Sequence, residues 1–245
     1  MTFTGKKADL SSFEGYLIKG GFPEYLKYDK SEILQELLND IIARDIMVRY
    51  KLKNLKTVKE MAIYLLTNVG KEFSYNSLKK TFNLGSVNTA ISFISYFEDS
   101  YLLFTVPRFD YSLKKQLVSA KKVYSIDNGL STVNSASFSA DNGRMLENLV
   151  FIQLRKKYND IFYFKEKNEC NFLVKEKEKI TKAIQVCFKV DEDNKEREIN
   201  GIMEAMEKFK LKEGLILAYD QEDELRIENK KITVKPAWKW LLKDN

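Results

Sequence analysis

The sequence contains no histidine among its 245 residues. Triad hydrolases of the serine and cysteine types use histidine to carry the proton, and many zinc sites and nucleases use it as a ligand or general base. The absence of histidine therefore excludes these triad hydrolases, histidine-ligated zinc sites and nucleases with a histidine general base. Any hydrolytic chemistry would have to use carboxylates, lysines and a hard cation such as Mg²⁺.

Cysteine and long apolar runs are also scarce. Cys170 and Cys187 are too few for a disulfide framework or a four-cysteine zinc site, and we expect both to pack as small apolar side chains. No run of about 18 apolar residues occurs, which predicts no membrane span and no membrane partner. The polar, basic start from Met1 to Leu10 lacks the apolar core of a signal peptide, so we expect a cytoplasmic protein.

Part of the net charge of +6 is concentrated in one short segment. The basic residues of this segment are Arg108, Lys114, Lys115, Lys121 and Lys122, against the acid Asp110. Such a cluster can face nucleic-acid phosphates, or it can be a solvated lysine surface, and the composition fits both.

The first half of the sequence has a helical pattern. Ser31 precedes apolar residues at helical spacing and is predicted to cap a helix, and another helix is expected over residues 57–66. Ser74 and Ser86 are predicted to cap two short helices separated by Gly85. Apolar, β-favouring runs at 101–106 and 122–126 flank the basic segment. Two helices, a strand, a basic loop and a strand predict a winged helix.

The second half has a mixed pattern after a boundary rich in Ser, Asn, Ala and Gly at residues 127–141. The expected order is a helix over 144–157, strands over 161–164, 170–174 and 183–188, a helix over 196–209, a strand over 214–219, a hairpin turning near 228–231, and a tail helix with Trp238 and Trp240. Helix, three strands, helix and strand is the core order of restriction-endonuclease-like folds. The predicted fold class is α+β or α/β, with a mixed sheet in the second half.

Several motifs occur together in a specific order. They are Gly20–Glu24 (GGFPE), Ile42–Ile46 (IARDI), Phe73–Asn76 (FSYN), Phe109–Gln116 (FDYSLKKQ), Tyr124–Leu130 (YSIDNGL) and Gly143–Asn148 (GRxxEN). In this combination the chain resembles the region that follows the ATPase core in prokaryotic AAA-type ATPase-family proteins.

The resemblance implies three parts. Residues 1–55 would correspond to the end of the ATPase region, 56–130 to a winged-helix domain, and 131–245 to a domain similar to PD-(D/E)xK nucleases. No phosphate-binding Gly-x-x-x-x-Gly-Lys-[Ser/Thr] loop is present, so ATP and Mg²⁺ would be cofactors only if an ATPase domain precedes this region. The chain is then either a fragment of such a protein or a natural relative without the ATPase domain.

By the same resemblance, the nuclease positions fall on residues that depart from the nuclease pattern. Glu147 would be the helix carboxylate, Asn171 the first strand carboxylate, and Gln185 and Cys187 the second carboxylate and the lysine. Neutral amides do not supply the charge that a divalent cation demands, so we expect neither a metal site nor a catalytic residue at these positions. We expect Asn171 and Gln185 to satisfy each other or backbone groups instead.

A rearranged nuclease site would need both a replacement carboxylate and a replacement lysine. Glu169 shares a strand face with Asn171 and could supply a carboxylate, and alternation could bring Lys189 in beside Cys187. This arrangement is the alternative hypothesis, a metal-dependent DNA nuclease.

A DNA-reading helix would begin at Ser86 and present Asn88 and Thr89, without an arginine for guanine recognition. Phosphate contacts would come from the basic segment, namely Arg108, Lys114, Lys115, Lys121 and Lys122. Winged helices also dock proteins, so DNA and a partner protein are both possible partners.

The leading hypothesis is a non-catalytic accessory module of an ATPase-family protein that binds nucleic acid or a partner protein. A pure protein-interaction module is a further alternative, with the acidic loop Asp191–Asp193 and the helix after it as its surface. The sequence makes no prediction of oligomeric state.

Overall fold

The computed structural model describes residues 8–137 and 141–243. The chain divides into two compact units. Among the described residues, the helical unit comprises 16–106, 118–137 and 141, and the sheet unit comprises 8–15, 107–117 and 142–243. Helices and a six-stranded mixed sheet confirm the predicted α+β class. In the described part of the chain, no helix is both long and apolar enough to cross a membrane.

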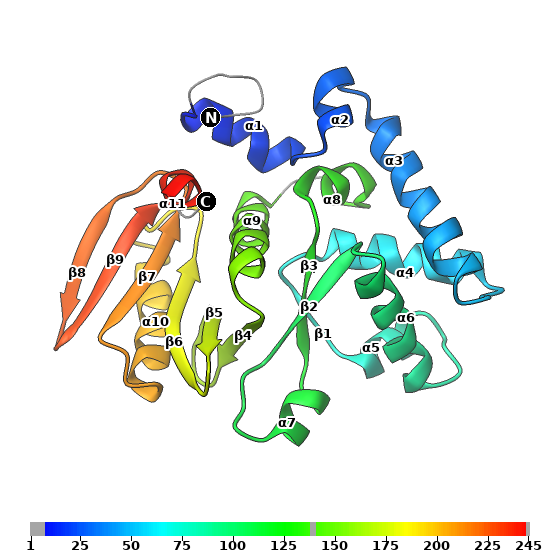
Figure 1. Cartoon of the computed structure of the whole chain (residues 1–245). Helices are drawn as coiled ribbons and strands as arrows, with labels where there is room; N and C mark the ends of the chain where they lie inside the picture. Colours follow the sequence, from blue (N-terminus) through cyan, green and yellow to red (C-terminus); the bar gives the residue numbers. More distant parts are fainter. Residues whose placement is uncertain (1–7, 138–140, 244–245) are drawn as a thin grey trace. The chain divides into compact units, whose positions relative to one another are not determined.

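The helical unit is built from short helices around a small sheet (Figure 1). Its helices are α2 (Pro23–Tyr28), α3 (Ser31–Asp40), the π-helix η1 (Ile41–Val48), α4 (Leu55–Thr67), α5 (Tyr75–Thr81), α6 (Val87–Asp99) and α8 (Asn128–Asn134). The strands β1 (Glu72–Phe73), β2 (Leu103–Pro107) and β3 (Lys121–Ser125) form a sheet in the order β1-β3-β2. Helix α1 (Leu10–Lys19) contributes residues to both units.

Two of the three predicted serine caps are confirmed. The Ser74 side chain accepts from the backbone N–H of Ser77 and completes a capping box, and Ser86 accepts from the N–H of Thr89. The predicted cap at Ser31 is wrong. Helix α3 already includes Ser31, and the extended residue before it is Lys30, whose side chain makes no capping hydrogen bond.

Helix α3 continues directly into the π-helix η1, which the sequence pattern does not predict. Its buried residues are spaced by four: Leu34, Leu38, Ile42 and Ile46, each at most 1% exposed. In an α-helix a four-residue spacing drifts around the axis by about 40° per step. In the wider turn of a π-helix a four-residue step falls short of a full turn, so the drift runs the opposite way and Ile42 and Ile46 stay on the core side.

A buried carboxylate joins the two ends of the helical unit's sequence. Asp127 accepts from the backbone N–H of Gly21 at 2.6 Å and from that of Leu130 at 2.9 Å, and so caps α8. The next residue, Asn128, donates from Nδ2 to the carbonyl of Leu17 at 2.7 Å. Burial raises the pKa of Asp127 above its ordinary value, although the backbone donors oppose the shift. Its contribution to stability therefore decreases as the pH rises through the folded-state pKa.

Two glycines permit the close approach around Asp127. Gly20 has a φ of +71°, and a Cβ there would collide with the Asp127 carboxylate. A Cβ on Gly129 would collide with the backbone carbonyl of Lys19. The Gly20–Glu24 and Tyr124–Leu130 motifs are thus two halves of one packed junction.

The sheet unit contains the larger sheet, with strand order β4-β5-β6-β7-β9-β8. Its strands are β4 (Asp160–Lys165), β5 (Glu169–Glu176), β6 (Lys179–Val186), β7 (Glu213–Ala218), β8 (Asp223–Ile227) and β9 (Lys230–Pro236). Strands β4, β5 and β6 pair antiparallel, β7 pairs parallel with both β6 and β9, and β8 closes the far edge antiparallel to β9.

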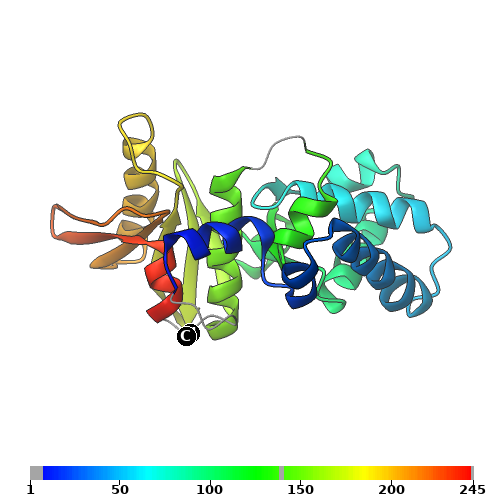
Figure 2. The ribbon, with the colours of Figure 1, turned by 90° about the horizontal axis from the view of Figure 1, so that it is seen from above.

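Helices α9 (Asn142–Lys157) and α10 (Lys195–Lys208) lie on opposite faces of this sheet, and α11 (Ala237–Lys243) follows β9 (Figure 1, Figure 2). The main core lies under α10, where Ile202, Ala205 and Met206 pack with Ile216 and Ile232. On the other face, Phe151 of α9 stacks on Phe172 of β5 with ring centroids 6.3 Å apart. The predicted order of helices and strands in the second half is confirmed.

The predicted basic loop between β2 and β3 has structure of its own. It contains α7 (Leu113–Val118), and its first part packs in the sheet unit. Phe109 donates its backbone N–H to the carbonyl of Tyr163 at 2.8 Å, and its ring makes edge contacts with Phe162 and Phe209. The sequence predicts a loop here because the segment is rich in charged residues. Its aromatic residues, however, determine where the segment packs.

The junction around Asp127 predicts a sharp difference between two glycine substitutions. We expect Gly129→Ala to lower the free energy of unfolding by about 1–3 kcal/mol, because the added methyl group meets backbone that cannot move aside. Urea titration followed by circular dichroism measures the change.

Gly85→Ala is the matched control for this prediction. Nothing lies within 4 Å of a Cβ at Gly85, so its effect should stay within about 0.5 kcal/mol. Equal stability of the two variants would contradict the close packing of α8 against the end of α1.

Candidate functional site

A pocket of about 430 Å³ lies in the sheet unit beside the ends of β5 and β6. Its lining residues are Glu147, Lys165, Lys167, Asn168, Glu169, Asn171, Gln185, Val186, Arg197 and Glu198. The fold therefore brings together four of the positions singled out in the sequence: Glu147, Glu169, Asn171 and Gln185. Cys187 and Lys189 are not among the lining residues.

Asn171 and Gln185 form a closed network across β5 and β6, as their amide chemistry predicts. The backbone N–H of Asn171 donates to Gln185 Oε1 at 3.0 Å, and the N–H of Val186 donates to Asn171 Oδ1 at 2.8 Å. Both residues are only 6% exposed. Because each amide oxygen already accepts a backbone N–H, neither is arranged primarily for a cation.

The network ends on Glu198, a residue that the sequence motifs do not include. Gln185 Nε2 donates to Glu198 Oε2 at 2.6 Å, and Arg197 donates to Oε1 through Nη2 at 2.5 Å and Nε at 3.1 Å. Glu198 is only 3% exposed. The pKa of Arg197 is raised, chiefly by its hydrogen bond to Glu198. A buried carboxylate is thus paired and hydrogen-bonded on both oxygens.

The sequence does contain a signal for Glu198. Residues 198, 201, 202, 203, 205 and 206 are the buried side of α10, and glutamate stands at the first of these positions. A carboxylate on a core-facing position needs a partner, so this exception to the apolar pattern marks the site.

Close backbone contacts hold α10 at the pocket. A Cβ on Gly201 would collide with the carbonyl of Glu169, so only glycine lets α10 approach the start of β5 this closely. Glu204 accepts the backbone N–H groups of Lys167 and Asn168 at 3.0 and 2.8 Å. These contacts fix the β4–β5 turn, which carries several of the lining residues.

The charges around the pocket balance. Three carboxylates, Glu147, Glu169 and Glu198, face three cations, Lys165, Lys167 and Arg197. Lys165 Nζ lies 3.4 Å from Glu169 Oε2. Among residues 8–137 and 141–243, no group of three or more His, Cys, Asp or Glu side chains is placed to hold a metal ion. Two of the three cations are paired with carboxylates of the same pocket, Lys165 with Glu169 and Arg197 with Glu198.

Cys187 and Lys189 lie beyond the end of β6 at Val186. Cys187 is buried in the core under α10, its backbone N–H donating to the carbonyl of Leu217 at 3.1 Å. Lys189 is exposed in the following loop. Strand β6 ends three residues before Lys189, so the alternation that could bring Lys189 in beside Cys187 in a rearranged site does not extend to it.

The predicted nucleic-acid residues are divided between the two units. In the helical unit, Asn88 is exposed, while Ser86 and Thr89 bond to each other as part of the α6 cap. In the sheet unit, Lys114 and Lys115 are exposed and Arg108 is half-buried.

Lys121 and Lys122 are buried, which argues against their predicted contact with phosphate. Lys121 Nζ lies 5.0 Å from the centroid of the Tyr75 ring and donates to the carbonyl of Ser119. Burial lowers the pKa of Lys121, an effect that Glu98 opposes. These two lysines are structural parts of β3, which the sequence does not indicate because lysine is rarely buried.

Comparison with known proteins places the chain among proteins without an assigned activity. Residues 10–139 match the family model described as a domain of unknown function, DUF8612. The uncharacterized protein MJ1544 of Methanocaldococcus jannaschii is 37% identical over 262 residues, covering 98% of this chain and 57% of that protein. An uncharacterized protein of Haemophilus influenzae is 27% identical over 194 residues, covering 76% of this chain and 48% of that protein.

The chain spans about half the length of the curated relatives it matches. No solved structure matches it. The family match covers the helical unit and part of the sheet unit, and it ends before the first residue of the pocket, Glu147.

The burial of the two cysteines predicts unreactive thiols. Burial raises the pKa of Cys187 to about 12, with the Glu198 carboxylate adding to the shift, and Cys170 is fully buried. We expect both thiols of the native protein to react with Ellman's reagent at least about 100-fold more slowly than in denaturant, because reaction requires local opening.

Denatured protein should report two thiols, which calibrates the assay. Rapid modification of one thiol in the native protein, assigned with Cys170→Ser and Cys187→Ser, would contradict the packing described around β5 and β6.

Proposed function

We propose that this chain, which belongs to the family of the domain of unknown function DUF8612, is a non-catalytic binding module of an ATPase-family protein. The reason is that its pocket holds amides where a metal-dependent nuclease needs carboxylates. Its ligand is nucleic acid or a partner protein. The observation that carries this proposal is the closed network of Asn171, Gln185 and Glu198.

The sheet unit supports a nuclease-like ancestry. Helix α9, the antiparallel strands β4, β5 and β6, helix α10 and the parallel strand β7 follow one another in the order expected for a PD-(D/E)xK-like domain. The pocket lies where that resemblance puts the active site, with Glu147 on the helix and Asn171 and Gln185 on the strands. Two amides there remove the negative charge that would bind Mg²⁺ and so favour binding without cleavage.

The helical unit supports a winged helix. Helix α4, strand β1, helices α5 and α6, and strands β2 and β3 follow in sequence, and β3 lies between β1 and β2 in the sheet. In such a unit α6 would be the helix that enters a groove. It presents Asn88 without an arginine, so binding to DNA would depend on shape and phosphate more than on base identity.

The link to an ATPase rests on the motif resemblance and on length. The curated relatives contain further sequence outside the matched part, which leaves space for an ATPase core. In that arrangement ATP and Mg²⁺ would bind to the ATPase core. The helical unit and the sheet unit would select the substrate on which the ATPase acts.

The proposal predicts weak, salt-sensitive DNA binding. Fluorescence anisotropy at low salt should show affinity for double- or single-stranded DNA with little dependence on sequence. The Lys114→Ala/Lys115→Ala double variant should bind more weakly. It should also reduce the slope of log affinity against log salt by about two, because two fewer phosphates would be neutralised.

Lys27→Ala/Lys30→Ala is the matched control, because it removes the same charge from two exposed lysines of the helical unit. If neither duplex nor single strand binds at low salt, the nucleic-acid part of the proposal is wrong and the protein-binding part stands alone.

Exposed apolar side chains support binding to a partner protein. Tyr111, Leu113 and Leu117, on and before α7, are 77%, 67% and 62% exposed, as expected for a docking surface.

A metal-dependent nuclease with a rearranged site is the second candidate. It is favoured by the three carboxylates Glu147, Glu169 and Glu198, which line one pocket together with Lys165. With Mg²⁺ or Mn²⁺ and plasmid DNA, the non-catalytic proposal predicts no cleavage above the level of Glu169→Ala, measured by gel electrophoresis. Cleavage that is abolished in both Glu147→Ala and Glu169→Ala would establish the nuclease and overturn the proposal.

A further inference from the structure

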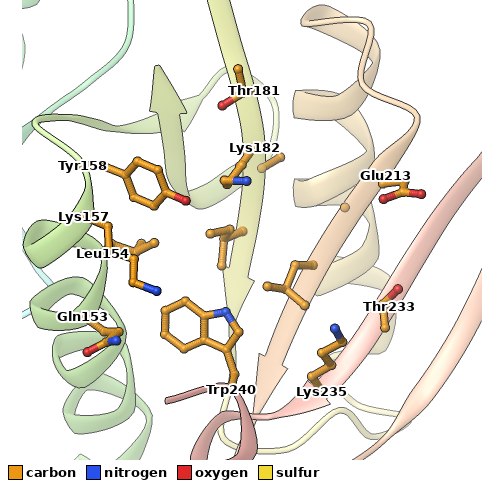
Figure 3. A pocket seen from close by; sticks show the side chains of 14 residues that line it. Gln153, Leu154, Lys157, Tyr158, Thr181, Lys182, Glu213, Thr233, Lys235 and Trp240 are labelled. Atoms are coloured by element: carbon orange, nitrogen blue, oxygen red, sulfur yellow. The ribbon is translucent and has the colours of Figure 1, made fainter. Parts of the chain in front are cut away.

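A second pocket of the sheet unit lies farther along α9 and shares no lining residue with the candidate site. It has a volume of about 370 Å³. Its lining residues are Gln153, Leu154, Lys157, Tyr158, Thr181, Lys182, Ala183, Ile184, Glu213, Gly214, Leu215, Thr233, Lys235 and Trp240 (Figure 3). Helices α9 and α11 form its walls, and β6, β7 and β9 form its floor.

Cations from three different elements line this pocket. Lys157 ends α9, Lys182 lies on β6 and Lys235 on β9, against one carboxylate, Glu213. In Figure 3 the side chains of Lys157 and Lys235 approach Trp240 from opposite sides, and Glu213 lies toward the outer edge. Three lysines against one glutamate attract an anion carrying more than one negative charge.

Aromatic and apolar groups provide the rest of the surface. The indole ring of Trp240 is half-buried and stands between α9 and the sheet in Figure 3. Leu154, Ile184 and Leu215 add apolar surface. A flat ring is the ligand group that such a surface suits, because stacking on an indole face tolerates any aromatic base.

Polar side chains complete the lining. Gln153 can both donate and accept hydrogen bonds, and Thr181 and Thr233 carry hydroxyl groups. Tyr158 lies under Lys182, whose Nζ is 5.8 Å from the centroid of its ring. Thr181 Oγ1 already donates to Glu176 Oε2, and Gln153 Oε1 accepts from Lys156 Nζ. The Thr233 hydroxyl is therefore the group placed to bind the edge of a base or a ribose hydroxyl.

The geometry points to a nucleotide-binding pocket, in which a base stacks on Trp240 and the phosphate is held by Lys157, Lys182 and Lys235. Inorganic phosphate would leave the ring surface unused, and a neutral aromatic compound would leave the lysines unused. The volume lies near the lower end of small-molecule sites, roughly 300–1,000 Å³, and so suits one nucleotide. The ligand is either a free nucleotide or the terminal nucleotide of a single strand, and it is independent of the DNA contact assigned to Lys114 and Lys115.

Isothermal titration of the whole chain with four ligands tests this pocket. AMP should bind about tenfold or more tightly than adenosine, because adenosine lacks the phosphate group. It should also bind about tenfold or more tightly than inorganic phosphate, which lacks the base. A 5′-phosphorylated dinucleotide that binds as well as AMP would assign the pocket to strand ends, and one that binds much more weakly would assign it to free nucleotides. Absence of AMP binding, or equal binding of AMP and phosphate, would overturn the proposal.

Variants locate the binding. Lys157→Ala/Lys235→Ala should weaken AMP binding by about tenfold, whereas Lys195→Ala, on the exposed start of α10, should not change it. Trp240→Phe keeps an aromatic face and should weaken AMP binding only a few-fold, while Trp240→Ala should weaken it by about tenfold. Circular dichroism checks that each variant is folded. AMP binding that survives the double lysine variant unchanged would place the nucleotide elsewhere and overturn the assignment.

Discussion

The hydrogen bond from Gln185 to the buried carboxylate of Glu198 is the interaction on which the candidate site depends. A carboxylate that is 3% exposed is stable only when its oxygens are satisfied, and here Gln185 serves one oxygen and Arg197 the other. Gln185 also accepts the N–H of Asn171, so the same amide joins β5, β6 and α10. A single side chain therefore links both strands to the helix through hydrogen bonds.

That arrangement is the physical basis for the proposal that the pocket binds a ligand without metal chemistry. A magnesium site needs oxygens that carry charge and are free to face the ion. The amide oxygens of Asn171 and Gln185 are neutral and accept backbone donors, and Glu198 is paired with Arg197. The helical unit contains a parallel case, since Asp127 is buried and serves the backbone of Gly21 and Leu130. In both units a buried carboxylate joins distant parts of the chain.

The local parts of this fold could be predicted from the sequence with little error. Ser74 and Ser86 begin helices, and the strands of the second half occur where β-favouring residues cluster. Asn171 and Gln185 satisfy each other and backbone groups, as expected of two buried amides. These predictions succeed because they depend on neighbouring residues or on one strand pair. Helix α8 is not predicted, because its Asn, Gly, Ser and Thr residues also suit loops. Helix α7 is not predicted, because its six residues are too few to establish a helical repeat.

Other features depend on contacts between distant segments. The absence of histidine, the lack of a phosphate-binding loop and the amides at the nuclease positions are properties of the sequence by itself, and they determined which chemistries are excluded. Only the tertiary structure decided that Lys121 and Lys122 are buried, that Phe109 packs with the sheet unit, and that Glu198 completes the pocket network. The physical reason is that the environment of a polar side chain is set by partners far away in sequence, whereas its chemical type is set by the residue alone.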